Sequence, residues 1–472
     1  MAEFVGRQHE LGVLAEALQG VRYSGDGALI WMRGRRRVGK SRLVEEFAAA
    51  ADVPYAFYRA PKREPAEALR RFETTVSESA LPAASLVSGG LAFDSWVAAL
   101  RVAADGASRE QPLLIVIDEL PYLLERDPAV DADLQEAWDR YLSNRPVMVI
   151  AIGSDVSMME ALTERGRALY GRPTREMLIP PFSPREMAEL LGMDPADALD
   201  AYLVVGGFPT LAVSWRTGWS RQRFLQSALA ETATHFVLNG ERILEAEFQG
   251  KLQARAVLEA IGAGERTYGN VRRASGVSNE SSLSHALETL AETKRVVRAA
   301  LPYAAPPGRK SKRYSVADPY LRFWLRFVGP NIEEIDRGRS DLVIARIEEE
   351  WTSYRGKAIE PIVQQGLERL LPDPRFGSAR YVGGYWTRNN DVEVDLVGAE
   401  APVPEKVAFV GSIKWRERSP FGKHDTRVLV QHRSSVPGAE DALLVGVSRS
   451  GFKDDAGLDI ALGPDEIVAA WS

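Results

Sequence analysis

Cysteine is absent from the 472-residue chain, and histidine occurs only five times, at scattered positions. Without cysteine the protein can form no disulfide, thiolate zinc site, iron–sulfur cluster or cysteine nucleophile. The scattered histidines argue against an all-histidine metal site. No apolar run approaches about 18 residues, and Glu3 and Arg7 stand where a signal peptide would place its apolar stretch. These absences predict a cytoplasmic protein without a membrane segment.

The composition, with 45% hydrophobic and 26% charged residues, is typical of a soluble globular protein. The length indicates roughly three domains at about 100–200 residues each. The net charge of −6 argues against a surface that is positive everywhere. An average of this kind can still hide a local basic patch.

The first 180 residues alternate between apolar strand patterns and amphipathic helix patterns. The expected strands cover 28–34, 54–60, 112–118, 146–153 and 176–180. This alternation predicts an α/β fold, a parallel sheet with helices on both faces, over 1–182. From Ser183 helical periodicity runs to about Ile261, which predicts a helical lid over 183–250.

The remainder of the chain divides into two further predicted regions. Residues 251–330 show three helix patterns and then a basic segment interrupted by Pro and Gly, an order that resembles a winged helix-turn-helix. Residues 331–472 begin with an acidic helical connector and continue with a helix over 358–371. Four strand patterns follow, at 381–388, 391–398, 406–415 and 441–448.

The segment Gly34-Arg-Arg-Arg-Val-Gly-Lys40-Ser41 fits the pattern GxxxxGK[ST], and it lies between an apolar strand and a helix. Glycines let the backbone wrap around phosphates, so that its N–H groups and the helix N-terminus bind the anion. Lys40 is expected to reach the β- and γ-phosphates, and Ser41 to bind Mg²⁺. The motif therefore predicts a nucleotide site.

Acidic and polar residues follow two other predicted strands. Asp118 and Glu119 end the strand over 112–118, where Asp118 can hold Mg²⁺ and Glu119 can orient or deprotonate the attacking water. Ser154, after the strand over 146–153, either senses the γ-phosphate or only caps the next helix. Arg172 either stabilises the transition state, in cis or across a subunit interface of a homo-oligomer, or is a solvated loop residue.

Together these segments resemble the archaeal-type ATPases of the wider AAA+/STAND group of P-loop ATPases. The resemblance rests on FVGR (4–7), the P-loop, IDELPYL (117–123), GSDVSMM (153–159), LYGRPT (169–174), GGFP (206–209) and DPYLRFW (318–324). It implies that residues 4–7 line the base side of the nucleotide and that Gly207–Pro209 belong to the lid. The expected contacts to ATP or ADP are Phe4, Val5, Arg7, Gly34, Arg37, Val38, Gly39, Lys40, Ser41, Arg42 and Pro209.

Residues 265–315 carry ten basic and four acidic side chains, a net of +6 within an acidic chain. Lys and Arg contacts to phosphates supply most non-specific DNA affinity. The expected DNA contacts are Arg272, Arg273, Ser281, Arg309, Lys310, Lys312 and Arg313. The alternative is an intramolecular clamp, in which the winged helix contacts the nucleotide domain.

The C-terminal region resembles the PD-(D/E)xK nucleases, with Glu360 on a helix, Asp395 at the end of a strand and Lys414 on the next strand. In that family acids bind Mg²⁺ and the lysine stabilises charge. Ser412 stands where the family places a carboxylate, and a hydroxyl is a poorer Mg²⁺ ligand. The expected result is a degenerate restriction-endonuclease-like domain; Glu360 and Lys414 as plain surface charges are the alternative.

The sequence thus predicts an ATP-binding and ATP-hydrolysing switch that couples nucleotide state to a winged helix and a nuclease-like domain, with DNA as the partner. Two alternatives stay open. One is a Mg²⁺-dependent nuclease that ATP licenses, and the other is a scaffold that holds nucleotide without turnover.

Overall fold

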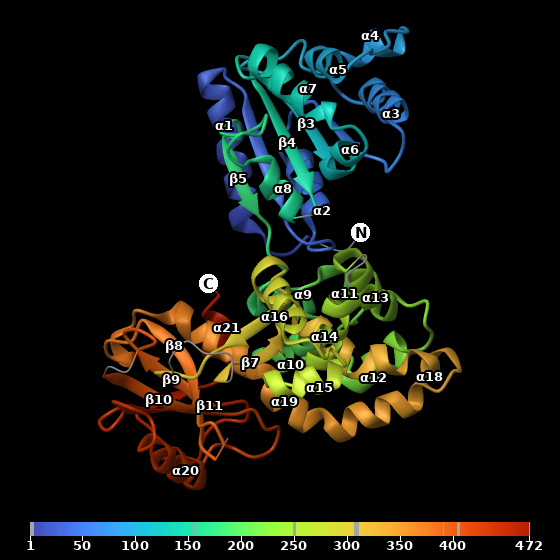
Figure 1. Ribbon diagram of the computed structural model, residues 1–472. Coiled ribbons are helices and arrows are strands. Elements are labelled where there is room, and N and C mark those ends of the chain that lie inside the picture. The colour runs from blue at the N-terminus through green and yellow to red at the C-terminus, as the bar shows by residue number, and fades with distance from the viewer. Residues whose placement is uncertain are drawn as a thin grey trace. The chain divides into compact units, whose positions relative to one another are not determined.

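The computed structural model describes residues 4–154, 156–248, 252–305, 311–389, 391–403 and 406–471. The chain divides into two compact units (Figure 1). Unit 1 comprises Met1–Pro181 and Phe208–Thr210, and unit 2 comprises Phe182–Gly207 and Leu211–Ser472. Unit 2 therefore contains all three later predicted segments, 183–250, 251–330 and 331–472, except for Phe208–Thr210. The separation of these segments into three domains stays a prediction.

Unit 1 is built on a five-stranded sheet in the order β2-β3-β4-β1-β5, and every neighbouring pair is parallel. The strands are β1 (Ala28–Arg33), β2 (Tyr55–Arg59), β3 (Leu113–Asp118), β4 (Val147–Gly153) and β5 (Arg175–Leu178). All five predicted strands are confirmed. Strands β1, β3 and β4 are buried along almost their whole length, which explains their unbroken apolar sequences.

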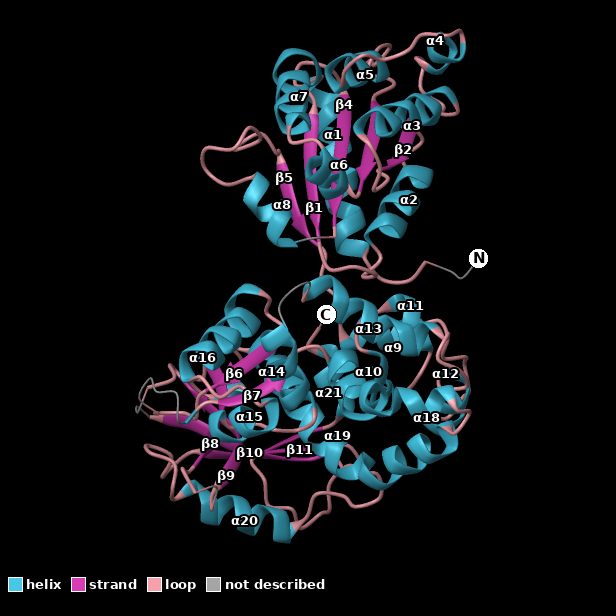
Figure 2. Ribbon diagram, turned by 45° about the vertical axis from the view of Figure 1, so that its right-hand side comes forward, coloured by secondary structure: helices cyan, strands magenta, loops and turns pink. Residues whose placement is uncertain are grey.

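Helices cover both faces of this sheet (Figure 2). They are α1 (Gln8–Ser24), α2 (Lys40–Ala50), α3 (Pro65–Ser77), α4 (Ala84–Ser88), α5 (Trp96–Ala103), α6 (Leu120–Arg126), α7 (Ala129–Ala137) and α8 (Val156–Leu162). On one face the rings of Tyr58, Phe72 and Trp96 pack together, with centroids 5.3 Å apart for Phe72 and Trp96. Because all strands are parallel, the residues that follow β1, β3 and β4 meet at one edge of the sheet.

Unit 2 begins with helices and ends with a second sheet. Its helices before that sheet are α9 (Pro184–Leu191), α10 (Pro195–Val205), α12 (Arg221–Ala228), α13 (His235–Glu247), α14 (Leu252–Gly262), α15 (Tyr268–Ser275), α16 (Glu280–Glu288), α17 (Pro319–Phe323), α18 (Ile332–Asp336) and α19 (Ser340–Leu370), while α11 (Pro209–Ala212) spans the division between the units. Strands β6 (Val297–Ala300) and β7 (Arg313–Val316) pair antiparallel after α16. The three predicted helices are present and are followed by a hairpin, while the winged helix-turn-helix assignment stays a prediction.

The second sheet has the order β12-β11-β10-β9-β8 and is mixed. Its elements are β8 (Tyr381–Trp386), β9 (Glu393–Ala399), β10 (Val407–Lys414), α20 (Lys423–Arg433), β11 (Leu443–Ser448), β12 (Ile460–Leu462) and α21 (Pro464–Ala469). The four predicted strands are confirmed. The sequence analysis missed β12, whose three residues are too few to show a periodic pattern.

Helix α19 corrects one predicted boundary, because the connector and the helix expected from residue 358 form one helix of 31 residues. Pro361 lies inside it and cannot donate the backbone hydrogen bond that Lys357 O would accept in a regular helix. Arg322 donates to that carbonyl instead, at 3.2 Å. A side chain from α17 thus replaces the lost hydrogen bond, and the helix continues. Among the described residues, no helix combines the length and apolarity needed to cross a membrane.

Candidate functional site

The P-loop, residues 34–41, connects β1 to α2 as predicted. Gly39 has a φ of 93°, in the left-handed region that favours glycine. A Cβ atom at Gly34 would lie 2.4 Å from the carbonyl oxygen of Ile179, so no larger residue fits there. The two glycines of the motif therefore serve backbone geometry, and the loop ends at the N-terminus of α2, where an anion is favoured.

Lys40 is buried under this loop, with 5% of its surface exposed. Its Nζ donates to Gly34 O at 2.6 Å, to Arg35 O at 2.9 Å and to Ser154 Oγ at 3.3 Å. Burial lowers the pKa of Lys40 to about 8, although the nearby charges of Glu119 and Asp118 favour the ammonium form. Burial deprives the Lys40 ammonium of hydration, and the negative charge of a bound phosphate would stabilise it instead.

Ser41 and Asp118 meet directly beside Lys40. The Ser41 hydroxyl donates to Asp118 Oδ2 at 2.8 Å. A hydroxyl and a carboxylate are oxygen ligands of the kind that Mg²⁺ prefers, so this pair fits the metal that accompanies ATP. Arg59, the last residue of β2, donates to the same carboxylate oxygen at 3.1 Å.

Glu119 adopts a φ of 60° between β3 and α6. Its Oε1 accepts a hydrogen bond of 2.5 Å from Ser154 Oγ. Its Oε2 is buried and has no hydrogen-bond partner within the described part of the chain. A carboxylate oxygen left without a donor is available to a water molecule. The structure thus brings together the four predicted residues Lys40, Asp118, Glu119 and Ser154.

The remaining predicted nucleotide contacts have different surroundings. Arg7 is 4% exposed and donates to the carbonyls of Val38 and Pro180, so it braces the P-loop through protein contacts. Pro209 lies near Gly39, since a Cβ on that glycine would be 4.0 Å from Pro209 Cγ. Phe4, Val5 and Arg37 are half-buried, Val38 is buried, and Arg42 pairs with Glu46 on an exposed face of α2. A direct contact between these residues and a base stays a prediction.

Arg172 requires a correction. It lies before β5, near Thr174, whose backbone N–H donates to Leu29 O at the beginning of β1. The P-loop starts five residues later, about 16 Å away along the strand, which is farther than an arginine side chain reaches. Its guanidinium instead forms two hydrogen bonds of 2.8 Å with Asp139. Action in cis is therefore wrong, and action across a subunit interface stays a prediction.

The sequence analysis missed several cations at the carboxyl edge of the sheet. Besides Arg59, these are Arg36, which donates to the Tyr122 hydroxyl at 2.6 Å, and Lys62, whose Nζ lies 4.4 Å from the Tyr122 ring centre. Arg59 stands opposite Asp118 in the register of β2 and β3. The apolar sequence pattern predicts that Arg59 lies at the end of a strand. The strand order is needed to show that this end lies beside Asp118.

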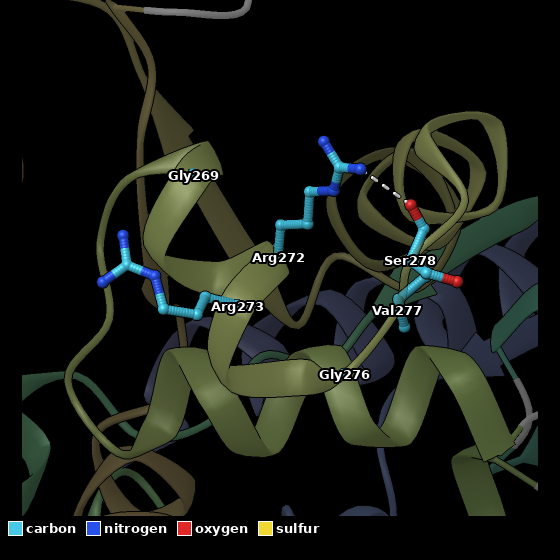
Figure 3. A pocket seen from close by; sticks show the side chains of 6 residues that line it. All are labelled: Gly269, Arg272, Arg273, Gly276, Val277 and Ser278. Atoms are coloured by element: carbon cyan, nitrogen blue, oxygen red, sulfur yellow. Dashed lines mark hydrogen bonds between the residues drawn. The ribbon is translucent and has the colours of Figure 1, made fainter.

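In unit 2, a depression of about 350 Å³ lies at the turn between α15 and α16. It is lined by Gly269, Arg272, Arg273, Gly276, Val277 and Ser278. Arg272 donates to Glu280 at 2.8 Å and to Ser278 O at 2.9 Å, whereas Arg273 is exposed and points away from Ser278 (Figure 3). The predicted contact Ser281 donates its hydroxyl hydrogen to Asn279 Oδ1. Asn279 in turn caps α16, so these two side chains already serve the helix start.

The hairpin of β6 and β7 is docked on the C-terminal sheet. Tyr303 is 1% exposed, and its backbone N–H donates to Gly384 O. Arg313 pairs with Glu393 and lies 4.4 Å from the Trp386 ring centre. The predicted wing therefore contacts the C-terminal region and not the nucleotide domain that the clamp alternative expects, and the DNA contact of Arg313 stays a prediction. Lys312 is half-buried, while Arg309 and Lys310 lie outside the described residues.

The predicted nuclease-like residues are also partnered by the protein. Asp395 Oδ2 accepts hydrogen bonds from Ser412 Oγ at 3.1 Å and from Ile413 N at 2.8 Å. Glu360 pairs with Arg266 at 3.4 Å. The pKa of Glu360 is raised to about 7, mainly by burial; the charge of Arg266 opposes this shift, and the charges of Asp395 and Glu393 contribute to it. Lys414 is half-buried and favours the charged form of Asp395.

These contacts leave little for a metal ion. Where the structure describes the chain, no group of three or more acidic or histidine side chains has the geometry to hold one. Ser412 donates to the carboxylate that a metal would need, and arginines neutralise Glu360 and Glu393. That the C-terminal region is a degenerate nuclease-like domain stays a prediction.

Comparison with known families matches two parts of the chain. Residues 4–214 match the model described as an ATPase domain predominantly from Archaea. Residues 324–427 match a model described as archaeal and bacterial proteins of unknown function. Residues 4–214, which include the site described above, thus resemble an archaeal-type ATPase domain, and residues 324–427 resemble proteins of unknown function from archaea and bacteria.

One relative matches most of the chain, and two solved structures match a smaller part of it. The uncharacterized protein MJECL04 of Methanocaldococcus jannaschii is 25% identical over 428 residues, which cover 88% of each chain. The Walker-type ATPase PABY2304 of Pyrococcus abyssi is 20% identical, with a TM-score of 0.49 over 68% of this chain and 96% of that one. The Aeropyrum pernix ORC2 protein, in ADPNP–ADP complexes, is 16% identical, with a TM-score of 0.48 over 73% and 96%.

Proposed function

We propose that this chain, which resembles an archaeal-type ATPase domain in residues 4–214, is a molecular switch that binds and hydrolyses MgATP. The observation that carries the proposal is the meeting of Lys40, the acidic pair 118–119 and Ser154 at the carboxyl edge of one parallel sheet. A phosphate-binding lysine, metal-binding oxygens and a carboxylate with a free oxygen are the parts that phosphoryl transfer to water requires.

Each residue has a role in this proposal. The P-loop amides and Lys40 bind the phosphates, and Ser41 with Asp118 holds Mg²⁺, whose charge offsets the charge that develops on the phosphoryl group. Glu119 orients the attacking water and accepts its proton. Ser154 contacts both Lys40 and Glu119, so a γ-phosphate that attracts Lys40 also changes the surroundings of Glu119. A ligand shifts a conformational equilibrium only through such differential contacts.

One assay tests the proposal against both alternatives. The purified chain is incubated with ATP and Mg²⁺, with and without DNA, and both the nucleotides and the DNA are resolved on gels. ADP formation with intact DNA supports the switch. DNA that is cleaved by the wild type but remains intact with the Lys414→Ala variant would identify the ATP-licensed nuclease. Bound nucleotide without phosphate release in either condition would identify the scaffold.

The Glu119→Gln variant is expected to bind ATP as tightly as the wild type but to hydrolyse it about a hundredfold more slowly, since general base catalysis contributes about 10²–10⁴. The amide keeps the shape and can still accept from Ser154. Equilibrium binding of a fluorescent ATP analogue and release of phosphate are measured in parallel. Glu125→Gln, on the neighbouring helix α6, is the matched control and keeps normal turnover. Wild-type turnover in Glu119→Gln would show that another group is the base.

We also propose that unit 2 binds nucleic acid phosphates through the depression beside α15 and α16. Arg273 is exposed there and Arg272 lines the same depression, whereas the hairpin is occupied by the C-terminal sheet. Phosphate contacts of this kind are independent of sequence and weaken with salt.

The charge reversal Arg273→Glu should lower the affinity for duplex DNA and reduce the slope of log affinity against log salt by about 1. Fluorescence anisotropy across a salt series measures both. Arg337→Glu is the control, because Arg337 is an exposed arginine of the same unit that pairs only with Glu333 four residues earlier. An equal loss in both variants would reveal a general charge effect, and no loss in Arg273→Glu would rule out this surface.

A further inference from the structure

The Asp118 carboxylate receives two donors on one oxygen atom. Ser41 Oγ and Arg59 Nε both donate to Oδ2, at 2.8 Å and 3.1 Å. The Asp118 side chain is 3% exposed, whereas that of Arg59 is 64% exposed. A buried anion is thus held by a cation whose own side chain lies mostly in solvent. The metal role expected for Asp118 requires this same carboxylate.

Arg59 contacts two carboxylates, Asp118 closely and Glu45 at a longer distance. It is the last residue of β2, directly opposite Asp118 in the strand register. A second carboxylate, Glu45 of α2, lies 3.9 Å from its Nη2, and Glu45 is 45% exposed. Glu45 therefore offers the guanidinium another partner when it leaves Asp118. Ion pairs with one solvent-exposed partner are weak and readily exchanged.

Charge makes Arg59 and a divalent cation compete for Asp118. In the structure, Lys40 and Arg59 are the cations closest in charge interaction to Asp118 and Glu119 among the contacts described above. A divalent ion bound through Ser41 and Asp118 would place two positive charges next to the guanidinium, and like charges at this separation repel one another. The guanidinium and a divalent ion therefore compete for the Asp118 carboxylate.

We propose that Arg59 is a positioning residue that holds the Asp118 carboxylate in the nucleotide-free protein and gives way to the divalent cation that arrives with the nucleotide. Arg59 thereby sets how strongly nucleotide binding depends on the cation. This inference rests on the proposed MgATP site. It adds that the cation must displace a side chain of the protein itself.

The test measures binding of a fluorescent ADP derivative to the full chain, in EDTA and over a titration of Mg²⁺. In Arg59→Ala the Asp118 carboxylate loses the guanidinium that neutralises it when Mg²⁺ is absent. The ratio of the dissociation constant in EDTA to that in saturating Mg²⁺ should therefore rise by about three- to fivefold, which is the range of a weak ion pair. Arg59→Lys keeps a cation and should stay close to the wild-type ratio. Unchanged thermal melting verifies that both variants are folded.

Arg63→Ala is the matched control. Arg63 is an exposed arginine four residues after Arg59, and its partner is Glu67 at 3.0 Å. Its removal should leave the Mg²⁺ dependence at the wild-type value. An equal change in Arg59→Ala and Arg63→Ala would reduce the effect to general electrostatics and overturn the inference.

Two other results would also overturn it. An unchanged ratio in Arg59→Ala would show that Arg59 does not compete with the cation. A selective loss of affinity for a non-hydrolysable ATP analogue, with ADP binding and its Mg²⁺ dependence unchanged, would make Arg59 a γ-phosphate contact instead. If the wild type bound no nucleotide in any condition, the proposed function itself would fail and the inference with it.

Discussion

Lys40→Ala is expected to abolish detectable nucleotide binding and, with it, ATP turnover. The variant removes the only ammonium that the structure places under the P-loop carbonyls within the described residues, and a charged hydrogen bond to a phosphate is worth about 3 kcal/mol, a factor of about 100. The loss of the same contact in the transition state lowers turnover further. Calorimetric titration with ADP and a phosphate-release assay measure the two effects.

The pKa of Lys40 gives the same prediction a pH dependence. Burial lowers this pKa to about 8 in the folded protein, from an ordinary value near 10.5. The ammonium that attracts phosphate is therefore lost as the pH rises through 8, and ADP affinity should fall between pH 7.5 and about 9. The folded state binds the proton less tightly than the unfolded state, so stability rises over the same range. Lys40→Arg, whose side chain stays charged, should bind with no such pH dependence.

Arg42→Ala is the control for the lysine variant. Arg42 lies two residues later on α2, is 44% exposed and pairs with Glu46. Although the sequence predicts a nucleotide contact for it, this exposed position implies an affinity within about threefold of the wild type. A loss as large as that in Lys40→Ala would mean that the phosphate lies over the outer face of α2 rather than under the P-loop.

The sequence predicted the nucleotide site because its signals are local. The P-loop glycines, Lys40 and the pair 118–119 each adjoin an apolar strand, and a parallel sheet brings such strand ends to one edge. It could not predict Arg59 or the fate of Arg172, because both depend on strand order. β2 lies beside β3, which brings Arg59 to Asp118, and the direction of β5 carries Arg172 to the opposite edge.

The predictions for unit 2 were limited by contacts between segments far apart in sequence. The basic stretch 265–315 has the composition of a DNA-binding surface, but Arg266 and Arg313 pair with Glu360 and Glu393 from the C-terminal region. The sequence predicts a helix from residue 358, and the contact from Arg322 explains how α19 continues through Pro361. Charge counts and proline signals do not show which partner a folded chain will supply.

The second large effect is expected from Asp200→Ala, which should destabilise unit 2 by about 3–5 kcal/mol. Asp200 lies on α10 and is 11% exposed. It accepts from Arg355 at 3.0 Å, from Arg449 at 3.0 Å and from the Trp415 ring N–H at 2.9 Å. Arg355 is 1% exposed, so the variant leaves a buried guanidinium with Glu417 as its remaining acid partner, and such uncompensated charges are costly.

Asp197→Ala is the matched control for this variant. Asp197 lies one turn earlier on α10 and also pairs with Arg449, but it is 61% exposed. Its removal should cost less than about 1 kcal/mol. Urea unfolding of the full chain is followed by tryptophan fluorescence, to which both units contribute, and by ADP binding, which reports on unit 1 alone, so that a transition without loss of ADP binding is assigned to unit 2. Equal losses in the two variants would refute a special role for the buried carboxylate.

The position of Asp200 gives this stability prediction a functional consequence. Helix α10 belongs to the predicted lid, Arg355 to α19, and Trp415 and Arg449 follow strands of the C-terminal sheet. One buried carboxylate therefore ties the predicted lid to the C-terminal region. If nucleotide binding moves the lid, the C-terminal sheet must move with it or Asp200 must lose its partners. Asp200→Ala should accordingly leave the ADP affinity unchanged. It should also remove any effect of nucleotide on the protection of β10 and β11 from hydrogen exchange. A nucleotide effect that persists in the variant would show that other contacts carry the coupling.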